Sequence, residues 1–176
     1  MKLGLSLITL AVQVLVLGLM VFAMLVPTNG MEETDSKTVY CINFWASGVC
    51  TEHASPISKL ECSGVKGAMQ AGAAFSIISM VLSVAVVVLL ILRGKFSGSN
   101  WAPRIAAMLC AIAILIVLVV ILIAMGQHCT LEAESSGNTV VFDTHNGTSR
   151  GLGLGFILVC IALVLEIVVA ILSFVF

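Results

Sequence analysis

The stretch AMQAGAAFSIISMVLSVAVVVLLIL, residues 68–92, contains no charged side chain. An α-helix needs about 20 apolar residues to cross the hydrocarbon core of a bilayer, so this stretch predicts a transmembrane helix. Three similar stretches cover residues 4–26, 105–125 and 152–175. The sequence therefore predicts an all-α transmembrane fold with four spans in one membrane domain, residues 1–176. The connections are loops 27–67, 93–104 and 126–151.

The composition excludes several classes of protein. Of the 176 residues, 60% are hydrophobic and 10% are charged, whereas soluble domains average about 25% charged residues. A water-soluble fold is excluded, and a separate catalytic domain of on the order of 100 residues would not fit beside four spans. A net charge of -1 without a Lys/Arg cluster argues against a nucleic-acid partner. The chain shows no catalytic or metal-binding motif, so we expect a non-enzymatic protein without cofactor or metal.

Loop charges predict the orientation of the chain. Four basic residues and no acid flank the spans on one side, and they are Lys2, Arg93, Lys95 and Arg104. Because Lys and Arg next to spans stay in the cytoplasm, both termini and loop 93–104 are expected to be cytoplasmic. Loops 27–67 and 126–151 then face outward from the plasma membrane or another membrane of the secretory pathway.

The outer loops contain candidates for modification. Four cysteines lie there, at Cys41, Cys50, Cys62 and Cys129. Outer cysteines usually pair in an oxidising compartment, and zinc binding is the weaker alternative. The sequence leaves their connectivity open, although Cys50–Cys62 would close the shortest loop and leave Cys41 for Cys129. Asn146, in Asn146-Gly147-Thr148, is a glycosylation candidate.

The outer loops also predict strands. Residues 38–45 and 139–142 are dense in β-branched and aromatic residues, which favour strands. A small disulfide-stapled sheet on the outer helix ends is the simplest interpretation, with Trp45 as a structural plug beneath it. Cys110 and Cys160 lie inside spans, where we expect them to be plain packing residues.

The stretch Cys41-Ile42-Asn43-Phe44-Trp45-Ala46-Ser47-Gly48-Val49-Cys50 resembles the signature of the amastins, surface glycoproteins of kinetoplastid parasites. The residues that match the signature are Cys41, Ile42, Phe44, Trp45 and Cys50. Asn43, Ala46 and the shorter spacing to Cys50 depart from it and indicate a divergent, amastin-like member. The four-span layout extends the resemblance over the whole chain. It implies suggested roles in the parasite surface, host contact and ion or proton handling.

A wider resemblance is to the claudin-type four-span proteins. Their first outer loop carries a Trp followed by two cysteines, here Trp45, Cys50 and Cys62. This resemblance implies a left-handed four-helix bundle capped by an extracellular β-sheet. It also implies roles in surface organisation, adhesion or barrier formation.

Glu166 is the most informative residue for chemistry inside the membrane. An acid near the centre of a span costs about 2.5 to 3.5 kcal/mol on insertion scales and is rarely kept without a reason. A helical rise of about 1.5 Å per residue places Gln13 and Ser83 at nearly the same depth. We therefore expect these three residues to form an intramembrane polar cluster inside the bundle.

Three interpretations of Glu166 stay open. In the first, a neutral Glu166 hydrogen-bonds to Gln13 and fixes the register of the helices. In the second, Glu166 relays protons or small cations, although no second ionisable side chain lies near its depth. In the third, Glu166 contacts a neighbouring subunit.

Small residues predict close helix packing. Gly72 shares a helix face with Ser83, and Gly155 shares one with Glu166. Gly151 and Gly155 also form a GxxxG pair, which is a signal for contact between membrane helices. We expect such faces to form the bundle interior and to support lateral self-association as a homo-oligomer.

Together these features predict a non-enzymatic integral membrane surface protein of amastin-like type. Its outer loops would serve a structural, adhesive or host-interaction role. Its expected partners are the lipid bilayer, further copies of the chain, and an extracellular protein or host membrane. The alternative function is a proton or small-cation channel or carrier that uses Glu166.

Overall fold

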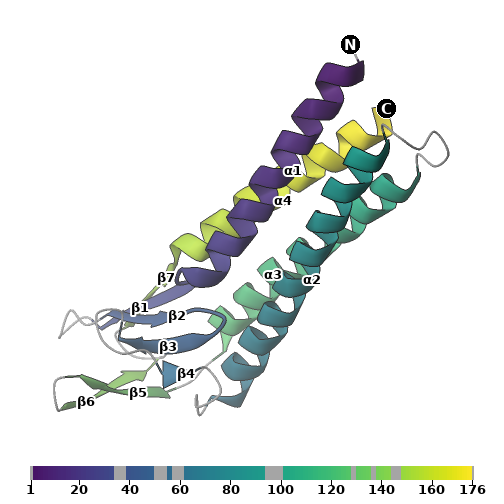
Figure 1. Ribbon diagram of the computed structural model, residues 1–176. Helices are drawn as coiled ribbons and strands as arrows, with labels where there is room; N and C mark the ends of the chain where they lie inside the picture. The colour runs from purple at the N-terminus through teal and green to yellow at the C-terminus, as the bar shows by residue number, and fades with distance from the viewer. Residues whose placement is uncertain are drawn as a thin grey trace.

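The computed structural model describes residues 2–33, 39–49, 55–56, 62–93, 101–127, 130–135, 138–143 and 148–175. Within these ranges four long helices lie side by side (Figure 1), and they are α1 (Lys2–Leu25), α2 (Ser63–Arg93), α3 (Trp101–Gly126) and α4 (Leu154–Val175). Both chain termini lie at one end of the bundle, called here the termini side. The strands lie at the other end, called here the sheet side.

Each helix is long and apolar enough to cross a membrane. The four candidate spans are Ser6–Leu25, Ser63–Leu92, Trp101–Gly126 and Leu154–Phe174. They confirm the prediction of a multi-pass protein that resides in a lipid bilayer.

Local sequence explains most helix ends. α1 ends at Leu25, shortly before Pro27, whose ring cannot continue the hydrogen-bond ladder. Pro103 is accommodated in the first turn of α3, where its missing N–H would have no partner in the helix. α2 begins at Ser63, before the expected start of its apolar stretch, because the helix continues through polar residues that include Lys66.

The described strands form two antiparallel sheets. The larger has five strands in the order β4-β3-β2-β1-β7, namely β1 (Asn29–Glu33), β2 (Val39–Ile42), β3 (Ala46–Val49), β4 (Ser55–Pro56) and β7 (Thr148–Leu152). The smaller consists of β5 (Thr130–Ser135) and β6 (Asn138–Asp143). A sheet over the helix ends is therefore present as predicted, and the expected strands at 38–45 and 139–142 correspond to β2 and β6.

The pairing of β1 with β7 joins the two loops that connect helices on the sheet side. β1 follows α1, and β7 precedes α4. Their register aligns Asn29 with Leu152 and Gly30 with Gly151. The helices attached to these two strands, α1 and α4, also lie next to each other in Figure 1.

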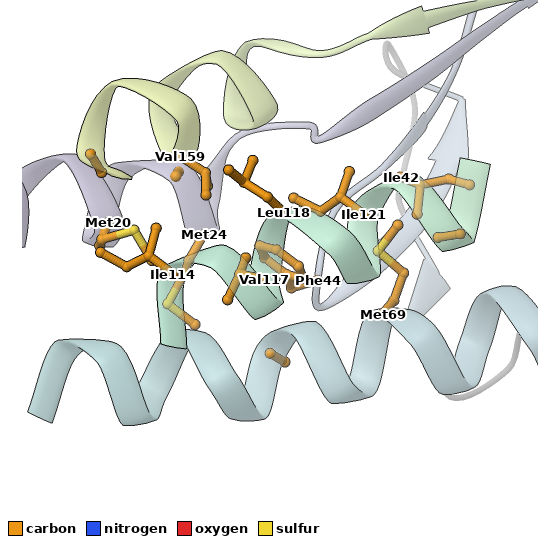
Figure 2. Packing of buried hydrophobic residues seen from close by; sticks show 14 of the residues in the cluster. Met20, Met24, Ile42, Phe44, Met69, Ile114, Val117, Leu118, Ile121 and Val159 are labelled. Atoms are coloured by element: carbon orange, nitrogen blue, oxygen red, sulfur yellow. The ribbon is translucent and has the colours of Figure 1, made fainter. Parts of the chain in front are cut away.

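The main apolar core lies between the helices and the larger sheet (Figure 2). Met20 of α1, Met69 of α2 and Ile114 of α3 belong to this cluster of buried side chains. Ile42 at the end of β2 and Phe44 just beyond it complete it from the sheet. The sheet is thus packed onto the bundle by two apolar side chains of the first interhelical loop.

Candidate functional site

The bundle interior contains a polar cluster, defined here as Gln13, Ser83, Cys110 and Glu166. Each helix supplies one of these residues, in the order α1, α2, α3 and α4. Gln13 Nε2 donates hydrogen bonds to Ser83 Oγ at 2.8 Å and to Glu166 Oε2 at 2.9 Å. All four side chains are buried. The structure thus brings together Gln13, Ser83 and Glu166, which were expected to lie at the same depth, and it adds Cys110.

Cys110 is the member that the sequence reasoning missed. Its thiol donates to the carbonyl oxygen of Ser79 at 3.4 Å and also interacts with the Glu166 carboxyl group. Its depth was the available signal, because Cys110 lies about 5 Å from the midpoint of α3 toward the termini side. Cys110 therefore contributes polar chemistry as well as packing.

Three buried polar atoms have no hydrogen-bond partner within the described part of the chain. They are Gln13 Oε1, Glu166 Oε1 and Ser76 Oγ. A polar atom left without a partner in an apolar medium costs free energy, so each is suited to bind water or a proton-bearing group. Among the described residues, no group of three His, Cys, Asp or Glu side chains could hold a metal ion.

The amastin-like stretch forms the contact between the sheet and the bundle. Asn43 Oδ1 accepts hydrogen bonds from Trp45 N at 2.9 Å and from Ala46 N at 2.6 Å, which fixes a tight turn between β2 and β3. Phe44 is 1% exposed and lies in the core, whereas Trp45 is 47% exposed. The prediction that Trp45 is the plug was wrong. The Asn43 turn directs the neighbouring Phe44 inward instead.

Gly72 on α2 leaves the space that the Phe44 ring occupies. A Cβ atom at Gly72 would lie 2.5 Å from Phe44 Cε1 and 3.4 Å from Val120 Cγ1. Because real Cβ atoms do not approach other atoms that closely, glycine permits this contact. Gly72 therefore has the packing role expected of it. It packs against Phe44, which follows β2, and against Val120 of α3.

A second close contact joins the backbone just after α1 to the start of α4. A Cβ atom at Gly155 would lie 3.0 Å from the carbonyl oxygen of Pro27, and one at Gly153 would collide with the same oxygen. Gly155 N donates to Pro27 O at 2.9 Å, and Gly153 N donates to Thr28 O at 2.8 Å. Glycines here let two backbones meet at hydrogen-bond distance.

The predicted GxxxG pair is not a helix face. Gly151 belongs to β7, whereas Gly155 belongs to α4. The reason is the pairing of β7 with β1, which keeps residues 148–152 extended, so that the helix begins only at Leu154. Gly155 does pack closely, but against the backbone that follows α1.

A family comparison bears directly on these two sites. The model of the amastin surface glycoprotein family matches residues 9–173. This chain belongs to the amastin family. The match spans the polar cluster, the Phe44 contact and the strands of the larger sheet. Comparison with curated proteins gives no match.

Membership confirms the expected type of protein. Amastins are membrane surface glycoproteins and not a family of enzymes. The four apolar helices agree with that class. The wider likeness to claudin-type proteins stays a resemblance.

The cysteines of this family member fall into two groups. Cys41 and Cys62 are each disulfide-bonded, and Cys110 and Cys160 are free thiols. Cys50 and Cys129 lie outside the described residues, so the pairings Cys50–Cys62 and Cys41–Cys129 stay predictions. Asn146 also lies outside the described residues.

The small-residue faces are used within the chain. Gly72, Ser76, Ser79 and Ser83 are buried on α2, and Gly155 is buried on α4. These faces contact other parts of the same chain, so in the structure they offer no free surface for the expected self-association. Self-association through another face stays a prediction.

Proposed function

We propose that this amastin is a non-enzymatic surface protein that displays its larger sheet outside the cell for structural, adhesive or host-membrane contacts. The observation that carries the proposal is the pairing of β1 with β7, which unites the two interhelical loops of the sheet side in one platform. A platform fixed to the helices can transmit or resist force without chemistry of its own. No catalytic side-chain arrangement is needed for such a role.

The proposed orientation places the termini side in the cytoplasm. Arg104, near the start of α3, lies on that side and supports this orientation through the preference of basic residues for the cytoplasm. The two tryptophans bear on the depth of the bundle in the membrane. Trp45 and Trp101 are exposed on the sheet side and the termini side, respectively. Tryptophan favours the two membrane interfaces, so the pair would set the height of the bundle in the bilayer.

Orientation and display are tested on intact cells that express the full chain. One version carries an epitope tag at the N-terminus, and a second carries it in the β5–β6 hairpin, between Ser135 at the end of β5 and Asn138 at the start of β6. We expect antibody to bind the hairpin tag on intact cells and the N-terminal tag only after permeabilisation. The reverse pattern would contradict the proposed orientation.

Adhesion needs a separate test. Cells that display the full chain are compared, at equal surface level, with cells whose β5–β6 hairpin is replaced by a Gly/Ser linker. The hairpin forms its own sheet, so the five-stranded sheet is left intact as a matched scaffold. We expect both kinds of cell to be retained on a host-membrane layer more strongly than cells without the chain, because both keep the larger sheet. Retention equal to that of cells without the chain would contradict the adhesive role.

The second candidate is a proton or small-cation channel or carrier that uses Glu166. The unpaired Glu166 Oε1 inside the bundle favours it. Liposomes containing the protein are placed under a pH gradient, and flux is compared for the wild type and Glu166→Gln. Flux above that of empty liposomes that is lost in Glu166→Gln would establish transport. Flux equal to that of empty liposomes would leave the surface role.

A further inference from the structure

Buried polar side chains continue beyond the polar cluster in both directions along the bundle. On α2, Ser76 and Ser79 precede Ser83 at intervals of three and four residues, which places all three on one helix face. On α1, Thr9 lies one turn from Gln13, about 6 Å along the axis. Each of these side chains is almost fully buried. We call these side chains together with Glu166 the polar file, whose members are Ser76, Ser79, Ser83, Gln13, Glu166 and Thr9.

Two features of the polar file favour the binding of a proton or another hydrogen-bonding species. Its members Ser76, Gln13 and Glu166 each carry an unpartnered atom while being fully buried. The file also includes the carboxyl group of Glu166, which is the sole acid of the four helices. An ionisable group inside a membrane bundle marks a functional site by default.

The sheet-side end of the polar file is closed by Phe44. Its ring lies against Gly72, one helical turn from Ser76. Figure 2 shows Phe44 among apolar side chains that include Val117 and Ile121. A layer of aromatic and aliphatic side chains offers no hydrogen-bond partner to water or a proton, so the route ends there.

The termini-side end also contains an apolar cluster, but buried polar side chains lie in the same half. Ser6 lies about one turn from Thr9 toward the N-terminus and is partly exposed. On α4, Ser173 is buried two turns beyond Glu166, and its carbonyl oxygen accepts a hydrogen bond from Arg104 Nε at 2.8 Å. Polar groups therefore continue from Glu166 to the termini side on two helices.

We propose that Glu166 binds a proton inside the membrane and exchanges it with solution on the termini side through Thr9 and Ser6, while Phe44 closes the sheet side. The groups facing Glu166 are Gln13 from α1, Cys110 from α3 and, through Gln13, Ser83 from α2. Of these only Cys110 is titratable. The proposal goes beyond surface display and does not depend on it.

A hydrophobic carbodiimide is the probe for such a carboxyl group. The reagent takes the carboxyl proton on one nitrogen while the carboxyl oxygen bonds to its central carbon, and the O-acylisourea then rearranges to an N-acylurea. The adduct therefore adds the whole mass of the reagent. We expect intact-mass spectrometry of the full chain in liposomes to show one adduct that is lost in Glu166→Gln. An adduct level unchanged in Glu166→Gln would overturn the proposal.

The side of exchange is measured on the same vesicles. A protease added outside cleaves an N-terminal tag only from chains whose termini side faces outward, so mass separates the two orientations. The external pH is then lowered before labelling. We expect labelling to rise in cleaved chains and to stay constant in uncleaved chains. A rise in the uncleaved chains, or none in the cleaved chains, would overturn the proposed route.

Phe44→Leu tests the closure at the sheet side. It retains an apolar side chain and so is less disruptive than removal of the ring, and thermal unfolding in detergent checks that the fold remains. With more space beside Gly72, uncleaved chains should become sensitive to external pH. If the variant folds and its uncleaved chains stay insensitive, Phe44 does not close the route.

Discussion

The sheet-side and termini-side halves of the bundle interior are filled by different chemistry. Toward the sheet, apolar side chains of all four helices pack with Ile42 and Phe44 in one large cluster, and buried Ser76 and Ser79 of α2 lie in the same half. Toward the termini, the second apolar cluster contains four buried side chains, Val86, Leu90, Ala107 and Val169. That half shares its interior with buried Thr9 and Ser173, and the polar cluster lies between the two halves.

This difference suggests separate tasks for the two halves. Lipid is as apolar as a helix surface, so membrane helices associate through close packing and hydrogen bonds and not through hydrophobic exclusion. The sheet-side half uses close packing, which also fixes the sheet. The polar cluster and the termini-side half use hydrogen bonds, which fix helix register and, at Glu166, can hold a proton. Substitutions should therefore affect the two halves in different ways.

Phe44→Ala should have the largest effect on stability. It removes a buried ring at the junction of sheet and helices and should lower the free energy of unfolding by about 3–5 kcal/mol. Thermal or SDS-induced unfolding of the purified protein measures the loss. Trp45→Ala is the matched control, because Trp45 is the next residue in the chain and its side chain is exposed. An equal loss in both variants would show that the core position of Phe44 has no special role.

Gly72→Ala should have the next largest effect. The added methyl group would meet the Phe44 ring, and overpacking of this kind costs about 1–3 kcal/mol. The gain in helix propensity, about 1 kcal/mol, offsets part of it, so we expect a net loss of up to about 2 kcal/mol.

Gly67→Ala is the control for Gly72→Ala on the same helix. No atom lies within 4 Å of a Cβ atom built at Gly67, so the variant should unfold at or above the wild-type temperature. Combining Gly72→Ala with Phe44→Leu should recover part of the loss. Without such recovery, the contact between Gly72 and Phe44 is not the cause.

The polar cluster should show a smaller, pairwise effect. Gln13→Leu removes the donor to Ser83 Oγ and Glu166 Oε2, and Glu166→Leu removes one acceptor. Hydrogen bonds between membrane helices contribute about 0.6 kcal/mol on average and at most about 1.7. In a double-mutant cycle we therefore expect a coupling of about 1 kcal/mol between Gln13 and Glu166.

The single variants sharpen this prediction. A bundle that is more thermostable with Glu166→Leu, and unchanged in oligomeric state, would show that the polar contact is not needed for folding. Such a result would strengthen the case that Glu166 is kept for its proton. A coupling near zero would instead mean that the hydrogen bond to Gln13 contributes little in the bilayer.

Some features were predictable because they depend on one segment at a time. The four spans follow from the length of each apolar stretch, and the depth of Glu166, Gln13 and Ser83 follows from counting along each helix. These positions needed no knowledge of how the helices are arranged around one another.

The features that the sequence did not reveal depend on distant partners. Gly151 is in a strand because β7 pairs with β1, which lies more than a hundred residues earlier in the chain. The inward direction of Phe44 depends on the Asn43 turn and on the space at Gly72. Cys110 joins the cluster because α3 packs against both α2 and α4, an arrangement that the apolar pattern of α3 does not encode.

The smallest expected effect belongs to Arg104 at the termini side. Its Nε donates to Ser173 O at 2.8 Å, and its guanidinium lies 5.9 Å from the Trp101 ring centroid and 5.5 Å from that of Phe174. Arg104→Leu loses these contacts and the favourable position of a cation at a helix C-terminus. We expect a loss of about 0.5–1 kcal/mol, with faster hydrogen exchange confined to the last turn of α4.

Arg104→Lys separates charge from geometry at this site. It keeps the positive charge near the end of α4 but lacks the planar group that stacks on the two rings. Its exchange rate should therefore fall between those of the wild type and Arg104→Leu, with the sheet-side amides unchanged in all three. Faster exchange in β1 or β7 would show that the two halves are coupled along the helices, and the division of the interior into a packed half and a polar half would no longer describe its energetics.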